Sequence, residues 1–148
     1  MIDAFFRAGV GIVVRDDMHR ILCLRRKNTP GDAWQLPQGG IHADETPLDA
    51  MYRELMEETG LTRSDVSVEG SIEEWWVYEL PVEYRNAKVG WGQAQRWYLC
   101  KLLVPPDAVR ADQIEFVEFD WVTAEQLLAA AVPFRAAIYR RLVSTFAL

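Results

Sequence analysis

The clearest periodic pattern in the chain predicts a helix from about Pro47 to Thr59. Five residues fall there on one stripe at helical spacing, most of them apolar: Leu48, Met51, Tyr52, Leu55 and Thr59. Thr46 is a favourable N-cap, and Pro47 suits the first helical position. Gly60 follows the pattern directly and fits a left-handed C-terminal cap. Local sequence therefore marks both ends of this helix.

Most of the remaining regular structure is predicted to be β-strand. Runs rich in β-branched and aromatic residues lie at residues 10–15, 21–24, 66–80, 95–104 and 116–122. Residues 16–20 predict a hairpin turn between the first two runs, and residues 28–32 predict a loop. A helix is expected to begin near Ala124, and a final helix should follow Pro133 to about Thr145. Strands interrupted by a few helices indicate an α/β sandwich.

Length and composition suggest one domain covering residues 1–148. The chain has 148 residues, of which 50% are hydrophobic, enough for a substantial core. No apolar run approaches the length of a membrane span, and residues 1–7 lack the features of a signal peptide. We therefore expect a soluble cytoplasmic protein without a membrane partner. The sequence does not indicate protein partners.

The titratable residues narrow the possible chemistry. A net charge of −6 argues against broad nucleic-acid binding, although it permits recognition of one phosphorylated end. Cys23 and Cys100 lie in apolar, strand-like segments, where we expect buried, reduced thiols. His19 and His42 are too isolated to indicate a zinc site.

A stripe of glutamates runs along the predicted helix beside its apolar stripe. Glu54, Glu57 and Glu58 are three and four residues apart, and they repel one another near the negative end of the helix dipole. A solvated acidic face is the simpler interpretation, but a bound divalent cation would relieve the repulsion. Mg²⁺ prefers such hard oxygen ligands, and Mn²⁺ or another divalent metal is also possible. Arg53 could orient these carboxylates by pairing either with Glu57 or with Glu45.

These residues form one continuous motif from Gly39 to Leu61. The segment reads G-x5-E-x7-R-E-U-x-E-E-x-G-U, with U an aliphatic residue and with every position matched. It resembles the signature of the Nudix hydrolases, which cleave diphosphate bonds in nucleotide-like substrates. The resemblance implies an α-β-α sandwich with a mixed β-sheet and a loop–helix–loop catalytic motif. It also overturns the interpretation as a solvated acidic face.

The resemblance assigns roles to individual positions. It implies metal ligands at five positions: Gly39, Glu54, Glu57, Glu58 and Glu115. It implies structural support for the motif from Gly40, Glu45 and Gly60. Catalysis by direct attack of water on phosphorus is expected to involve Arg53, Glu54, Glu57 and Glu115. The proton acceptor is left open between Glu57 and Glu115.

Flanking segments resemble one Nudix branch, which contains bacterial RNA pyrophosphohydrolases and dinucleoside polyphosphate hydrolases. They are residues 34–40, 76–81, 92–98, 115–116 and 134–141. By this resemblance Arg7 and Arg26 contact phosphates, Phe134 stacks on a base, and Arg135 and Gln95 contact the substrate. Arg26 could instead be a solvated strand end, and Phe134 could be a core residue.

The predicted substrate is a phosphorylated RNA 5′ end, from which pyrophosphate is removed. A dinucleoside polyphosphate such as diadenosine tetraphosphate is the first alternative, followed by a nucleoside triphosphate. A noncatalytic module that binds nucleotides or RNA ends ranks low, because such a module would be expected to have lost catalytic glutamates that this chain retains.

Overall fold

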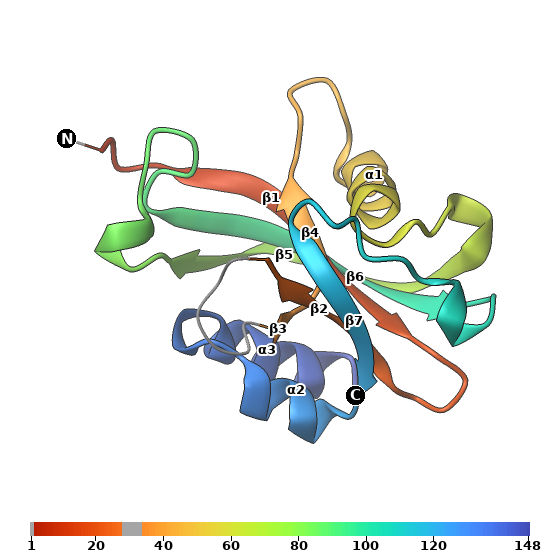
Figure 1. Cartoon of the computed structure of the whole chain (residues 1–148). Helices are drawn as coiled ribbons and strands as arrows, with labels where there is room; N and C mark the ends of the chain where they lie inside the picture. The colour runs from red at the N-terminus through yellow and green to blue at the C-terminus, as the bar shows by residue number, and fades with distance from the viewer. Residues whose placement is uncertain (1, 28–33) are drawn as a thin grey trace.

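The computed structural model describes residues 2–27 and 34–148, so the loop predicted at residues 28–32 lies outside the described residues. Seven strands form one mixed sheet (Figure 1). Their bounds are β1 (Phe6–Arg15), β2 (Ile21–Arg26), β3 (Trp34–Gln35), β4 (Gln38–Gly40), β5 (Val66–Glu79), β6 (Gly92–Leu102) and β7 (Phe116–Val122). The helices are α1 (Pro47–Thr59), α2 (Ala124–Ala130) and α3 (Pro133–Thr145). Single 3-10 turns cover Arg63–Asp65, Val82–Tyr84 and Pro106–Ala108.

The strands follow the order β3-β2-β1-β6-β5, with β4 paired to β1 and β7 paired to β2. β1 and β6 are parallel, whereas the other pairs of these strands are antiparallel. Val10 in β1 lies between Gly39 of β4 and Arg96 of β6 in the register. The α1 helix lies on one side of the sheet and α2 and α3 on the other (Figure 1), which confirms the predicted α-β-α sandwich.

Alternating side chains of the strands build a separate core on each face of the sheet. Val10 and Ile12 of β1 are buried in the cluster that includes Leu55 of α1. Val13 of the same strand is buried with Trp97 in the cluster that includes Tyr139 of α3. This period of two is the pattern of a strand covered on both faces. The prediction of an α/β arrangement therefore agrees with the packing as well as with the element order.

The two cysteines confirm the sequence interpretation. Cys23 and Cys100 are both free and buried, and they belong to the two different core clusters. Burial raises the pKa of each thiol to about 12. Each therefore behaves as a small apolar core residue at neutral pH.

The ends of α1 confirm the predicted caps. The Asp49 backbone N–H donates to Thr46 Oγ1 over 3.1 Å, and Gly60 adopts a φ of 75°. The Gly60 N–H donates to the Met56 carbonyl over 3.0 Å. The predicted apolar stripe was wrong at Leu48, which is exposed, whereas Glu58 is buried with the stripe. The buried face of the helix is therefore rotated toward its carboxylates.

The segment leading into the motif is tied to the opposite layer of the molecule. The Leu36 N–H donates to the hydroxyl of buried Tyr139 in α3 over 3.0 Å. Pro37 accepts from the Ile12 N–H through its carbonyl over 3.0 Å. These contacts fix the chain immediately before Gln38 and Gly39.

None of the described helices combines the length and the hydropathy needed to cross a membrane.

Candidate active site

Arg53 is the centre of the motif's hydrogen-bond network. Its guanidinium donates to the Gly40 carbonyl over 2.7 Å and to Glu45 Oε1 over 2.6 Å. It also reaches Glu54 Oε1 at 2.8 Å and Glu57 Oε2 at 3.2 Å. The two pairings left open by the sequence are therefore both present. Arg53 binds the loop that precedes α1 to the carboxylates on the helix.

Glu45 completes the closure of this loop. Its Oε1 accepts from the His42 backbone N–H over 2.8 Å in addition to its bonds from Arg53. The hydrogen bonds from Arg53 are the main reason that the pKa of Glu45 falls to about 2. Glu45 is thus a permanently charged anchor for Arg53 at physiological pH.

The two glycines of β4 leave room for one side chain on each face of the strand. A Cβ at Gly39 would lie 1.9 Å from Glu54 Cδ, and a Cβ at Gly40 would lie 2.2 Å from an Arg7 terminal nitrogen. Glu54 therefore lies directly over the backbone of Gly39, while Arg7 lies over Gly40. Only glycine leaves enough space for both approaches without displacement of a neighbour.

Glu58 is a buried carboxylate with few compensating contacts. Its exposed fraction is 3%, and the Gln38 backbone N–H donates to its Oε2 over 3.2 Å. Burial, followed by the negative charges of Glu54 and Glu115, raises its pKa well above the usual range. The pKa of Glu54 is also raised, mainly by burial, although Arg53 opposes the shift. The carboxylates are thus held where a positive charge would stabilise them.

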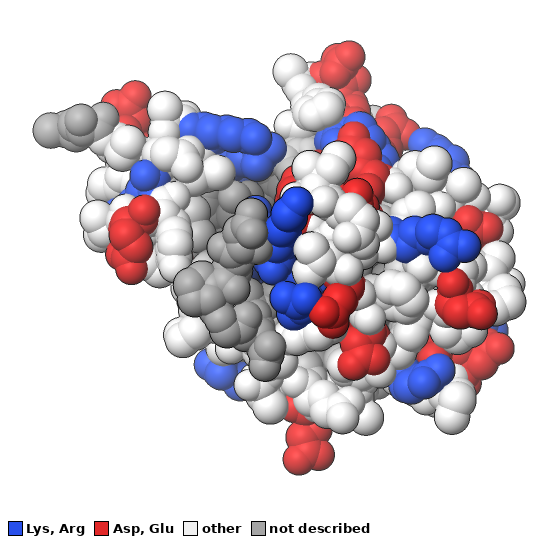
Figure 2. Space-filling model, viewed as in Figure 1, with Lys and Arg blue, Asp and Glu red and all other residues white. Residues whose placement is uncertain are grey.

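Glu115 approaches the motif from outside it. Its negative charge raises the pKa of both Glu54 and Glu58, which places it in the same electrostatic environment. Arg26 lies 3.8 Å from Glu115 Oε2, and the Lys27 N–H donates to the Glu115 carbonyl over 2.6 Å. Figure 2 shows Lys and Arg side chains beside Asp and Glu side chains near the centre of the molecular surface in view.

The carboxylates provide suitable ligands for a divalent cation, although they are not gathered around one position. In the described part of the chain, no three His, Cys, Asp or Glu side chains converge as a ready-made metal site. Arg53 occupies oxygens of Glu54 and Glu57. Negatively charged carboxylate oxygens that are partly or fully buried are the hard ligands that Mg²⁺ or a similar cation prefers. Arg53 thus leaves the second oxygen of each of these two carboxylates for an ion.

Two predicted substrate contacts, Phe134 and Arg135, lie on α3 rather than on the motif. Phe134 stacks against Tyr78, with 6.0 Å between ring centroids and an interplanar angle of 28°. The Arg135 guanidinium is 4.8 Å from the Phe134 ring centroid. Phe134 is partly buried against the core, so the alternative core interpretation describes part of its packing.

Gln95 connects this region to the motif through a residue that sequence reasoning missed. Its Nε2 donates to Gln38 Oε1 over 3.2 Å, and Gln38 Nε2 donates to the Tyr78 hydroxyl over 3.5 Å. Gln38 also holds Glu58 through its backbone N–H. The position of Gln38 directly before Gly39-Gly40 was the available sequence signal. Gln95 is 1% exposed, and among the described residues its Oε1 has no hydrogen-bond partner.

The structure therefore brings most predicted site residues together in two linked groups. The motif group contains Gly39, Gly40, Glu45, Arg53, Glu54, Glu57 and Glu58, with Arg7, Arg26 and Glu115 beside it. The second group contains Gln95, Phe134 and Arg135. Gly60 stands apart at the end of α1, where it caps the helix. Asp112, which precedes Glu115 by three residues, also went unnoticed in the sequence.

A family model and curated proteins each match nearly the whole chain. A model of the NUDIX domain matches residues 5–142. An RNA pyrophosphohydrolase of Pseudomonas putida is 43% identical, with 96% of this chain and 92% of that protein covered. An RNA pyrophosphohydrolase of Saccharophagus degradans is 45% identical, with 95% and 86% covered.

Solved structures with much lower identity have the same fold. The dihydroneopterin triphosphate pyrophosphohydrolase of E. coli has a TM-score of 0.78 at 19% identity, with 97% of this chain and 99% of that chain covered. An Ap4A hydrolase of C. elegans, solved as a binary complex, has a TM-score of 0.69 at 20% identity, with 94% and 98% covered.

Proposed function

The chain belongs to the NUDIX family, and we propose that it removes pyrophosphate from the 5′-triphosphate end of RNA. Similarity over nearly the whole chain to curated RNA pyrophosphohydrolases is the observation that carries this choice of substrate. The intact carboxylate group and its Arg53 network support hydrolysis of a phosphoric anhydride bond. A noncatalytic binding role would leave this whole set of acidic groups without a purpose.

We assign a divalent cation, Mg²⁺ by preference, to the motif carboxylates. Its ligands in this proposal are the Gly39 carbonyl and four carboxylates: Glu54, Glu57, Glu58 and Glu115. When bound, the ion offsets phosphate charge and favours ionisation of a coordinated water. The raised pKa values of Glu54 and Glu58 support the assignment, because a nearby positive charge would stabilise both ionised carboxylates.

The side chains divide the remaining tasks. Glu57 and Glu115 are 56% and 53% exposed, so either can meet an attacking water and accept its proton. Glu58 is too buried for that role and is better suited to hold the ion. Arg53 turns the carboxylates of Glu54 and Glu57 toward the site.

Substrate recognition is assigned to the residues around this centre. Arg7 and Arg26 bind phosphate oxygens through their planar guanidinium groups. Phe134 stacks on a nucleobase beside Tyr78, while Arg135 and Gln95 provide polar contacts. We further propose that residues 1–148 act as one domain in the cytoplasm. The net charge of −6 supports contact with an RNA end rather than binding along the strand.

The substrate proposal is tested by comparing kcat/KM for three substrates with Mg²⁺ present: triphosphorylated RNA, diadenosine tetraphosphate and a nucleoside triphosphate. The ratio of these constants measures discrimination directly. We expect RNA to be preferred, with 5′-monophosphate RNA and pyrophosphate as products. Rapid cleavage of diadenosine tetraphosphate with RNA left intact would contradict the assignment.

The metal assignment is tested separately by chelation. Turnover should stop in EDTA and return when Mg²⁺ is added in excess. Circular dichroism should show that the fold persists throughout. Undiminished turnover in metal-free buffer would exclude the cation from the reaction.

A further inference from the structure

The turn that carries Glu115 is organised around one side chain, Asp112. The Oδ1 atom of Asp112 accepts hydrogen bonds from the backbone N–H groups of Ile114, Glu115 and Phe116, each over 2.9 Å. A single carboxylate oxygen therefore binds three consecutive residues. Aspartate often stabilises turns by accepting from backbone groups two or more residues ahead.

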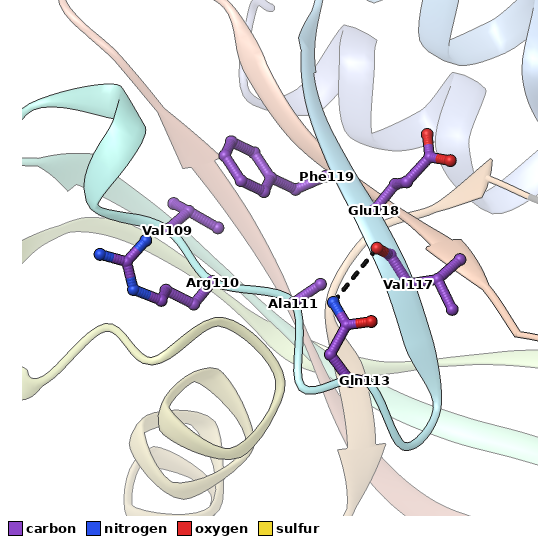
Figure 3. A pocket seen from close by; sticks show the side chains of 7 residues that line it. All are labelled: Val109, Arg110, Ala111, Gln113, Val117, Glu118 and Phe119. Carbon is purple, nitrogen blue, oxygen red and sulfur yellow. Dashed lines mark hydrogen bonds between the residues drawn. The ribbon is translucent and has the colours of Figure 1, made fainter.

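The same turn is held from its other side by the backbone. The Glu115 carbonyl accepts from the Lys27 N–H over 2.6 Å, and the Gln113 N–H donates to the Phe116 carbonyl over 2.8 Å. Gln113 adopts a φ of 64°, an uncommon conformation for a residue other than glycine. Its side chain donates to the Val117 carbonyl over 3.3 Å (Figure 3). Glu115 is thus presented by a closely bonded loop.

Apolar packing anchors the end of this loop, where Phe116 is fully buried, but not its tip. Ile114 at its tip is 80% exposed. An open pocket of about 490 Å³ lies between β7 and the segment that leads into the turn (Figure 3). Because the tip of the loop is exposed, its position depends on hydrogen bonds as well as on the burial of Phe116.

We infer that Asp112 is a positioning residue that fixes the backbone on either side of the Glu115 side chain, and thereby strengthens divalent-cation binding by the Glu115 carboxylate. The inference rests on the proposed function, in which Glu115 helps to hold the ion. The negative charge of Asp112 also raises the pKa of Glu58, behind burial and the charges of Glu54 and Glu115, so the inference assigns the larger effect to the position of the acceptor oxygen. Outer contacts of this kind typically change metal affinity by about 10- to 100-fold.

Two substitutions separate position from charge. Asp112→Asn keeps an oxygen at the same distance from the backbone but removes the charge. Asp112→Glu keeps the charge but moves the oxygens outward by one methylene. We expect Asp112→Glu to raise the Kd for Mn²⁺ by roughly 10- to 100-fold, whereas Asp112→Asn should change it less than about threefold. Electron paramagnetic resonance of free Mn²⁺ measures both values on the full chain without substrate.

Controls and a double mutant complete the experiment. Asp107→Asn and Asp107→Glu make the same chemical changes at an exposed position in the same connecting segment and should leave Mn²⁺ binding unchanged. Glu115→Gln should weaken binding about as much as Asp112→Glu. The double variant should be no weaker than Glu115→Gln alone, because Asp112 acts through Glu115. Hydrogen exchange at the Ile114 and Phe116 amides should accelerate in Asp112→Glu but not in Asp112→Asn. If Asp112→Glu fails to fold, Asp112→Ala takes its place.

The outcomes that overturn the inference are distinct. Loss of Mn²⁺ binding in Asp112→Asn but not in Asp112→Glu would show that charge governs the effect. Independent, multiplying losses in the double variant would show that Asp112 does not act through Glu115. Unchanged binding in Glu115→Gln would also refute the inference. Since RNA is absent from these titrations, an error in the proposed substrate would leave the result intact and would appear only in the kcat/KM comparison.

Discussion

The close approach of Glu54 to Gly39 makes Gly39→Ala a sharp test of the site. The added Cβ would lie 1.9 Å from Glu54 Cδ and 2.2 Å from both of its carboxylate oxygens. Ordinary contact begins at 3.4 Å, so the Cδ must retreat by about 1.5 Å. A displacement of about 1 Å in a reacting group costs on the order of 100-fold in rate. We expect kcat/KM to fall by at least that factor.

The assay has a matched control in the same protein. A Cβ at Gly70 in β5 would meet its nearest neighbour, Phe146, at 3.6 Å, an ordinary contact. Gly70→Ala should therefore retain activity within about threefold, while Gly39→Ala loses it. Overpacking should also lower the unfolding free energy of Gly39→Ala by about 1–3 kcal/mol. Steady-state kinetics and urea unfolding measure the two effects.

A second substitution shows whether the clash is the cause. Glu54→Ala removes the group that the new methyl would meet, so Gly39→Ala should cost much less stability in that background. Equal activity of Gly39→Ala and Gly70→Ala would refute the link between this close approach and the chemistry. An unchanged stability cost in the Glu54→Ala background would refute the steric explanation.

Three further predictions address the carboxylates and the support of the motif. Glu58→Gln should lower kcat by roughly 100-fold or more, yet raise the melting temperature of the metal-free protein, because it replaces a buried charge with a neutral isostere; a lower melting temperature would contradict this account. The pKa of Glu45 is lowered to about 2 by Arg53, so the pair stabilises the fold above about pH 4.5 and loses this effect as the pH falls toward 2. Glu45→Gln should thus be less stable than wild type at pH 7, with a gap that narrows on acidification in thermal unfolding; a constant gap would refute it. Tyr139→Phe leaves the Leu36 N–H without its acceptor and should cost about 1–3 kcal/mol in urea unfolding, whereas no change would show that water replaces the hydroxyl.

Elements governed by local sequence were the ones that sequence reasoning predicted best. The bounds of α1 follow from Thr46, Pro47 and Gly60, each of which acts within one turn of the helix. The longer strands are equally recognisable from their β-rich composition. β3 and β4 were missed because they contain only two and three residues, and pairing with β2 and β1 defines them. Their existence is a tertiary property that no short sequence window contains.

The site residues divide in the same way, into those that local sequence predicts and those that depend on tertiary contacts. The motif spacing identified the carboxylates and Arg53, since all of them lie on one helix and its leading loop. It could not reveal that Arg53 binds Glu45, Glu54 and Glu57 at once, because this depends on how the loop folds back. The contacts of Gln38 and Asp112 were also hidden. Both act through backbone groups and through partners distant in sequence or in an irregular loop.

The two glycines of β4 explain how one short strand serves both sides of the sheet. Successive residues of a strand face opposite ways, so Gly39 accommodates Glu54 on the α1 side, while Gly40 accommodates Arg7 on the other. The carboxylate proposed to bind the cation and the guanidinium proposed to bind phosphate are thereby brought to adjacent peptide units. The same strand begins at Gln38, which binds Glu58 through its backbone and Gln95 through its side chain. Three consecutive residues therefore connect the proposed metal ligands, the proposed phosphate contact and the polar contacts of Gln95. This connection requires β4 to keep a fixed register against β1.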